Sequence, residues 1–122
     1  MTKKQVEEIV KRYPYIACAV KKNQGVAEFV SGGRKRKIPI TEEVKAVCDI
    51  IGDIYLNTEN IWIRKMIEGF KAGRSDISLI HDMPWERNAF YERKRKLIDK
   101  IYNCCVSLQL VDYYEILNEE IA

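Results

Sequence analysis

The chain has few of the residues from which metal sites and disulfide frameworks are built. Among its 122 residues there is one histidine, His81, and the four cysteines include no Cys-x-x-Cys pair. Structural zinc sites need four ligands at short, regular spacings, so we expect no metal. We interpret Cys18, Cys48, Cys104 and Cys105 as buried, reduced thiols.

Long apolar runs are also missing. No stretch reaches the roughly 18 apolar residues of a membrane span, so we expect no membrane partner. The first eight residues, Met-Thr-Lys-Lys-Gln-Val-Glu-Glu, lack the apolar core of a signal peptide, and we expect a cytoplasmic protein. At 47% hydrophobic and 10% aromatic residues, the chain can nevertheless bury a core the size of one domain.

Signatures of catalysis are absent as well. Ser31-Gly32-Gly33-Arg34 is followed by basic residues and not by the Gly-Lys-Ser/Thr of a phosphate-binding loop. His81 has no recognisable nucleophile beside it, and a lone histidine near a helix end is usually structural. We therefore expect neither an enzyme, nor catalytic residues, nor a cofactor.

Charge is unevenly distributed along the chain. The net charge is only +3, but residues 1–40 carry +7, residues 41–83 carry −3, residues 84–105 carry +3 and residues 106–122 carry −4. Two concentrated basic segments favour a nucleic-acid partner more than the small overall charge does.

Hydrophobic periodicity predicts a mainly α-helical fold, a small bundle. A basic N-terminal part, residues 1–40, begins with a helix over 3–12 that Pro14 either kinks or restarts, and residues 16–22 continue it. Residues 26–38 are interpreted either as a short β-hairpin around Gly32-Gly33 or as a mobile loop. The basic run Arg34–Lys37 then either touches phosphate or is simply solvated.

The second part, residues 41–122, is predicted to be a helical domain. Thr41 caps a helix with an apolar face at Val44, Val47, Cys48, Ile51 and Tyr55, and the next helix ends at Gly73. The chain closes with an acidic helix whose stripe is Leu110, Tyr114, Leu117 and Ile121.

Between them, residues 74–101 predict a helix-turn-helix. Ser75 is a suitable N-cap for a short helix with Ile77 and Ile80 on one face. Pro84 ends that block and opens the next helix near its first turn. Over residues 85–103, the spacing of Phe90, Leu97 and Ile101 marks one apolar stripe surrounded by basic residues. Such a second helix can enter a DNA major groove.

The predicted contacts fall into two classes. Side chains near the start of the second helix can read base edges, and lysines and arginines around them can neutralise phosphates. The base-contact candidates are Glu86, Arg87, Asn88, Tyr91, Glu92 and Arg95, with Tyr91 alternatively half-buried; the phosphate-contact candidates are Arg74, Ser75, Arg93, Lys94, Lys96 and Lys100. The alternative is a solvated basic face on an ordinary bundle helix. Trp85 is expected to pack at the turn.

The run Met83-Pro-Trp-Glu-Arg-Asn-Ala-Phe-Tyr-Glu-Arg-Lys-Arg-Lys-Leu-Ile98 resembles the recognition helix of phage late-gene transcriptional regulators of the ArpU and RinA kind. Their helix-turn-helix is similar to region 4 of sigma factors, which reads the promoter −35 element. The resemblance covers about residues 41–105. It implies a small DNA-binding regulator of a prophage or mobile element, but Glu86 and Ala89 stand where the family often has Ser or Thr, so the base preference does not transfer.

Two functions follow as hypotheses. The first is a sequence-specific transcriptional regulator that binds double-stranded DNA, as a homodimer if its target is palindromic. The second is an accessory protein that works through a protein partner, such as a recombination directionality factor acting on a recombinase, or a protein docking on RNA polymerase. The acidic last helix would then be the surface that binds the partner.

Overall fold

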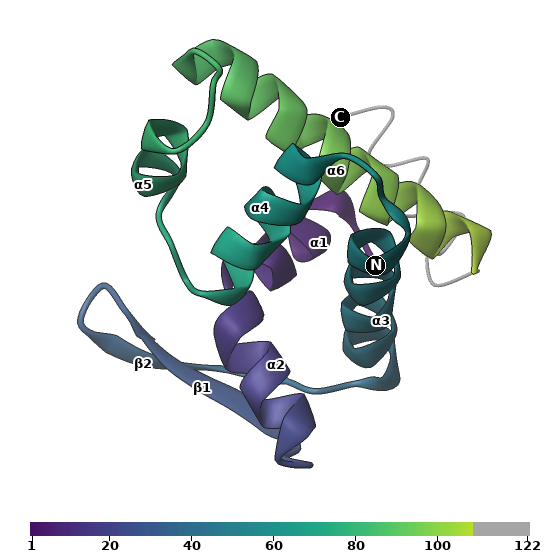
Figure 1. The fold of residues 1–122 in the computed structure, drawn as a ribbon. Helices are drawn as coiled ribbons and strands as arrows, with labels where there is room; N and C mark the ends of the chain where they lie inside the picture. The colour runs from purple at the N-terminus through teal and green to yellow at the C-terminus, as the bar shows by residue number, and fades with distance from the viewer. Residues whose placement is uncertain (109–122) are drawn as a thin grey trace.

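The computed structural model describes residues 1–108, which form six helices and one β-hairpin (Figure 1). The mainly helical fold class is thereby confirmed, hairpin included. The elements in chain order are α1 (Lys3–Lys11), α2 (Tyr13–Lys21), β1 (Val26–Ser31), β2 (Arg34–Pro39), α3 (Glu42–Asn57), α4 (Ile61–Lys71), α5 (Asp76–His81) and α6 (Arg87–Ser107). The predicted acidic C-terminal helix, with its apolar stripe at Leu110, Tyr114, Leu117 and Ile121, lies outside the described residues.

Local chemistry explains most of the helix boundaries. Thr2 and Gln5 form a capping box at the start of α1, and the side chain of Thr41 accepts a hydrogen bond from the Val44 amide at the start of α3. Pro14 stands in the first turn of α2, where its missing N–H is not needed, so it restarts the helix after α1. The side-chain oxygen of Asn60 accepts from two amides to cap α4.

The hairpin is a product of its turn. Gly32 and Gly33 have φ angles of 59° and 75°, a left-handed conformation that favours glycine and matches the twist of a two-residue hairpin loop. The strands pair antiparallel, with Phe29 opposite Arg36, and the hydrogen bond from the Ile40 amide to the Gly25 carbonyl (2.9 Å) closes the open end. The mobile-loop alternative is therefore wrong.

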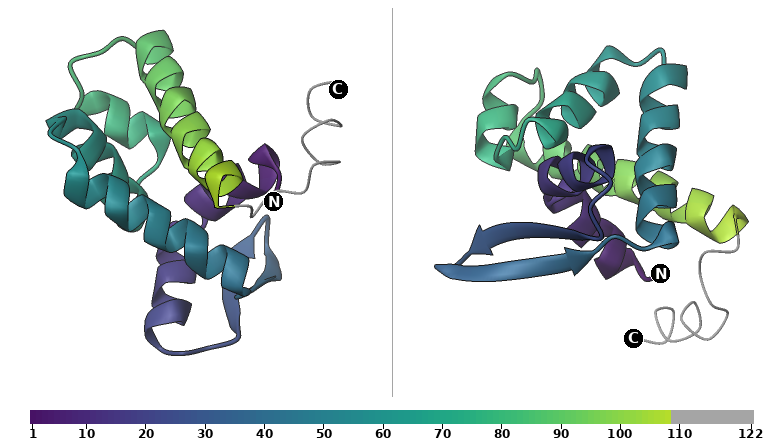
Figure 2. Two further views of the ribbon diagram at one scale, coloured as in Figure 1. Left: turned by 90° about the vertical axis from the view of Figure 1, so that its right-hand side faces the viewer. Right: turned by 90° about the horizontal axis from the view of Figure 1, so that it is seen from below.

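One hydrophobic core holds the helices together. It runs without a break from Val6 in α1, through Ile16 in α2 and Val47 in α3, to Met66 in α4 and Phe90 in α6. The long helix α6 packs against α1 and α3, while its N-terminal end extends past α4 toward α5 (Figures 1 and 2). Residues of 1–40 and of 41–108 thus share this core.

Two boundary predictions are corrected. The second helix of the predicted pair was expected over 85–103, but α6 begins at Arg87 with Glu86 as its N-cap and continues to Ser107. Pro84 consequently lies in the linker before the helix and not in its first turn. The apolar stripe is as predicted: Phe90, Leu97 and Ile101 are all buried.

The prediction of buried thiols holds for only part of the set. Cys105 is buried, Cys48 and Cys104 are half-buried, and Cys18 is exposed; none forms a disulfide. Cys18 falls on the outer side of α2 because Ile16 and Ala19 occupy its buried side. Among the described helices, none is both long and apolar enough to cross a membrane.

Candidate nucleic-acid interface

The short helix α5 is positioned by close packing against α4. A Cβ atom built on Gly69 would lie 2.3 Å from Cδ2 of Leu79, so only glycine lets the Leu79 side chain pack this closely. Leu79 is 1% exposed, whereas Ile77 is 64% exposed. The predicted Ile77–Ile80 face is therefore wrong: Leu79 is the buried anchor, and Ile80 is only partly buried against the core.

The turn between α4 and α5 is equally well defined. Gly73 has a φ of 74°, the Arg74 amide donates to the Gly69 carbonyl, and the Gly73 amide donates to the Phe70 carbonyl. This is a Schellman motif, which ends α4 and redirects the chain. Ser75 follows at once as the N-cap of α5, accepting a hydrogen bond from the Ser78 amide (3.2 Å). The Ser75 cap was predicted and is confirmed.

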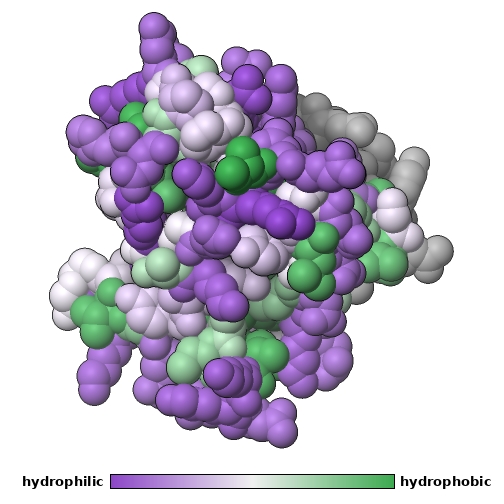
Figure 3. All heavy atoms as spheres, in the orientation of Figure 1, coloured by the Kyte–Doolittle hydropathy of each residue, from purple (hydrophilic) through white to green (hydrophobic). Residues whose placement is uncertain are grey.

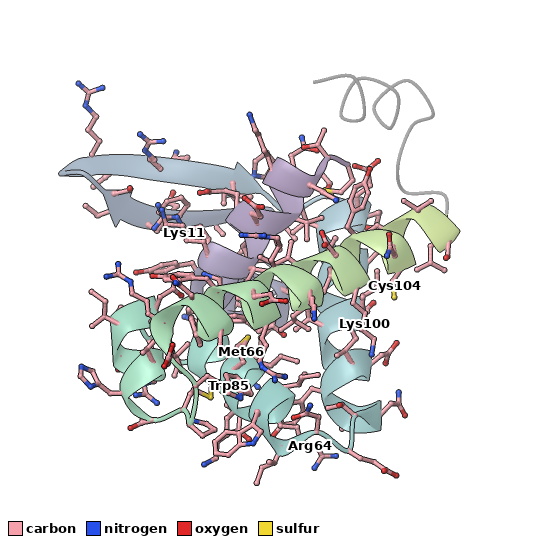
Figure 4. All side chains as sticks on the ribbon, turned by 90° about the horizontal axis from the view of Figure 1, so that it is seen from above. Lys11, Arg64, Met66, Trp85, Lys100 and Cys104 are labelled. Carbon is pink, nitrogen blue, oxygen red and sulfur yellow. The ribbon has the colours of Figure 1, made fainter. Side chains whose placement is uncertain are left out.

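The linker from α5 to α6, residues 82–86, is anchored by its own side chains. Met83 is buried, and the Trp85 ring packs edge-on against the Trp62 ring of α4 at 5.8 Å between centroids. The guanidinium of Arg93 lies 4.4 Å from the centre of the Trp85 ring, a cation–π contact that joins linker and helix. Trp85 thus packs at the turn, as expected (Figure 4).

Two of the residues predicted to contact phosphate, Lys94 and Arg74, form ion pairs with other residues of the α5–α6 region. The Lys94 ammonium lies 2.9 Å from Oδ1 of Asp76, and this pair is only 25% and 30% exposed. Arg74 donates to the Ser78 hydroxyl and backbone carbonyl and reaches Oδ2 of Asp82 at 2.6 Å. Both cations hold α5 in place, Lys94 from α6 and Arg74 from the preceding turn.

The predicted base-contact residues share the exposed side of the first turns of α6. Arg87, Asn88, Glu92 and Arg95 are exposed, while Phe90 on the opposite side is fully buried. Tyr91 is half-buried, the alternative left open by the sequence, with its ring 5.5 Å from that of Phe90. Glu86, the N-cap residue, is exposed and makes no capping hydrogen bond through its side chain.

A basic flank lies beside this side of α6. Arg93, Lys96 and Lys100 recur at spacings of three and four and are exposed. Lys96 forms a loose i,i+4 pair with Glu92 (3.5 Å), both highly exposed, so the pair contributes little stability. Within residues 1–108, the side chains of Arg95 and Lys100 make no ion pair or hydrogen bond, which leaves both charges available.

A groove of about 700 Å³ separates the N-terminal half of α6 from α1. Its lining includes Arg95 and Tyr91 from α6, Lys11 and Glu7 from α1, and the turn around Arg74. Figure 4 shows Lys11 on the part of α1 between the hairpin and α6. Both walls therefore carry an exposed cation.

Sequence reasoning missed the residues that orient the two helices. Asp76 was not singled out as the partner of Lys94, nor Gly69 as the close contact of α5, nor Trp62 as the partner of Trp85. The glycine inside an otherwise regular helical pattern was the one available signal, because helix interiors normally avoid glycine. The other two contacts depend on tertiary proximity.

Metal-ligating side chains do not cluster in the described part of the chain. No group of three or more His, Cys, Asp or Glu side chains in residues 1–108 could hold a metal ion.

The clearest pKa shift lies away from this region, at Cys48, whose thiol pKa is raised to about 11 by burial and then by the charge of Asp49. Figure 3 shows a mostly hydrophilic face with separate apolar patches.

Comparisons with known proteins do not assign a family. No family model, no curated protein and no solved structure matches the chain significantly. The ArpU and RinA likeness therefore remains a prediction from the sequence.

Proposed function

We propose that the protein is a sequence-specific DNA-binding regulator, with the first turns of α6 placed in the major groove. The observation that carries the proposal is the exposed row Arg87, Asn88, Glu92 and Arg95 on a helix whose other side is fixed in the core. An isolated basic helix would be only a charged surface. Here the short helix α5 lies beside the N-terminal end of α6 (Figure 1), and the linker 82–86 joins the two helices in the order of a helix-turn-helix.

The side chains in this row match the hydrogen-bonding edges of bases. Arginine can donate two bonds to guanine, asparagine can bond adenine with both its amide groups, and glutamate can accept from cytosine. Arg93, Lys96 and Lys100 on the basic flank would meet phosphates, and Lys94 and Arg74 would act by positioning α5 instead. We regard the regulator as belonging to a prophage or similar mobile element because of the sequence likeness at residues 83–98.

Selection from a random duplex library at two salt concentrations tests the function directly. A regulator should enrich one motif, and its affinity should fall steeply with salt because phosphate binding releases counterions. Salt-sensitive binding with no motif would contradict sequence-specific recognition by α6, and no binding at all would contradict DNA binding.

A pair of variants tests the site. Arg87→Ala with Arg95→Ala should abolish enrichment of the motif and weaken binding to the selected duplex by 10-fold or more, since a good bidentate base contact is worth about 1–3 kcal/mol. Lys21→Ala with Lys22→Ala is the matched control: it removes two exposed charges at the end of α2, away from α6 (Figure 1). Equal behaviour of the two variants would contradict the assignment.

A further inference from the structure

The hairpin is a built element and not a loose loop. Phe29 is 6% exposed, because its ring stacks on Tyr15 of α2 at 5.5 Å and the Arg12 guanidinium lies 4.4 Å above it. Arg12 also donates to the Ser31 hydroxyl at 3.1 Å. Together with the glycine turn, these contacts hold β2 in one orientation relative to the helices.

The second strand presents four consecutive cations, which we call the hairpin cations: Arg34, Lys35, Arg36 and Lys37. All are exposed, and successive residues alternate between the two faces of the strand. The one acid on the hairpin, Glu28, is 3.7 Å from Lys37, and both side chains are about 70% exposed. Within the described part of the chain, the side chains of Arg34, Lys35 and Arg36 form no ion pair.

Protection of a sheet edge explains only part of this charge. Lysine on an exposed sheet edge is one of several devices that discourage pairing with another chain. Four cations placed together raise the local electrostatic potential, and within residues 1–108 only Lys37 among them has an acidic partner, the exposed Glu28. Such a concentration of unpaired charge fits a polyanion.

The position of the hairpin fits the same polyanion that α6 would bind. In Figures 1 and 4, the hairpin tip and the N-terminal end of α6 project toward the same side of the molecule. Between them lies the groove with Lys11 on one wall and Arg95 on the other. Helix α1 thus places one exposed cation, Lys11, beside Glu7 in the space between the hairpin and α6.

We propose that the hairpin is a second DNA-contacting element, which binds backbone phosphates beside the bases read by α6. This inference rests on the proposed function, because it assumes that α6 lies in the major groove of the duplex. Phosphate contacts of this kind fix the register of a protein on the duplex and add affinity without adding sequence preference.

The test is Lys35→Gln with Lys37→Gln, measured on the selected duplex over a range of salt concentrations. These two side chains lie on the face opposite Phe29, so the packing on α2 is left intact. The slope of log K against log salt should fall in magnitude by about 2, because each neutralised phosphate contributes about 0.9. The enriched motif should stay the same, and hydroxyl-radical footprints should lose protection on one flank.

Controls separate this proposal from its alternatives. Lys21→Gln with Lys22→Gln should leave the slope unchanged, while Lys35→Arg with Lys37→Arg should restore wild-type binding. A Gln variant that binds and footprints like wild type would overturn the hairpin proposal and leave the α6 assignment standing. A changed motif would overturn a pure phosphate role. Failure of the wild-type protein to bind any duplex would overturn both proposals.

A separate measurement tests the alternative that the hairpin cations only protect the sheet edge from pairing with another chain. If the Gln variant aggregates on size-exclusion chromatography while the monomeric fraction binds DNA with the wild-type salt slope, the cations serve the sheet edge and the proposal is overturned. Preferential binding to single-stranded RNA or to an acidic protein in competition with the duplex would likewise overturn it.

Discussion

The ammonium of Lys94 lies 2.9 Å and 3.0 Å from the two carboxylate oxygens of Asp76, and thus bridges α6 to the first turn of α5. The same ammonium is 5.6 Å from the centre of the Phe70 ring in α4. One side chain therefore contacts all three helices of the proposed DNA-binding unit. We therefore expect Lys94 to act mainly by holding these three helices in their relative positions.

Exchange of the two charges should reveal that role. Asp76→Lys or Lys94→Asp alone leaves a partly buried charge opposite a like charge, and we expect each to lower the free energy of unfolding by about 1–3 kcal/mol. In urea denaturation, the double variant should recover a large part of the lost free energy of unfolding, because an ion pair forms again with the two charges exchanged. Additive losses in the double variant would contradict a direct pairing.

DNA binding should follow the same pattern. If Lys94 serves by positioning α5, the double exchange restores affinity along with stability. Affinity that stays low in a stable double variant would instead make Lys94 a phosphate contact.

Gly69 offers a second test of how α5 is held. Gly69→Ala places a methyl group against the buried Leu79 side chain, and we expect the overpacking cost of about 1–3 kcal/mol to exceed the gain in helix propensity, so that the variant is destabilised. Gly52→Ala in α3 is the matched control: nothing lies within 4 Å of its new Cβ, so better helix propensity should stabilise by roughly 0.5–1 kcal/mol. Thermal denaturation of both variants measures the difference. Opposite signs are expected, and a stabilised Gly69→Ala protein would contradict the close packing.

Cys48 predicts a pH dependence of stability. Its thiol pKa is 9.0 when unperturbed and about 11 in the fold, because burial and then Asp49 disfavour the thiolate. The unfolded chain therefore loses this proton first as pH rises. The stabilisation is fully present below pH 9 and is lost progressively between about pH 9 and pH 11.

Urea denaturation at pH 8 and pH 10.5 measures that loss. Cys48→Ala should show a smaller fall in the free energy of unfolding than the wild type, while Cys18→Ala, which removes an exposed thiol, should show the wild-type fall. The pKa values of Tyr13 and Cys105 are also raised by burial, and that of Tyr55 by its hydrogen bond to Glu68, so these groups contribute a further fall in the same direction. Identical falls in all three proteins would contradict the Cys48 assignment.

Local chemistry in the sequence determined the element boundaries best. Ser75 caps α5, Gly73 ends α4 and Pro14 restarts the chain as α2, because each of these residues satisfies a backbone requirement within a few neighbours. The spacing of Phe90 and Leu97 likewise identified the buried side of α6, since a helix of that length has one clear apolar stripe.

Only the tertiary structure decided the features that depend on distant neighbours. A helix as short as α5 has no long periodic pattern, so the close approach of Leu79 to Gly69 chose which of its apolar side chains is buried and left Ile77 exposed. The pairing of Lys94 with Asp76 depends on how α5 is placed beside α6, and the sequence alone cannot distinguish a cation that forms such an ion pair from a free one. The glycine turn allows the hairpin, and its orientation is fixed because Phe29 packs against Tyr15 of α2 and against Arg12 between α1 and α2. Backbone chemistry thus determined local structure, and packing decided which apolar side chains are buried and which charges are held in ion pairs.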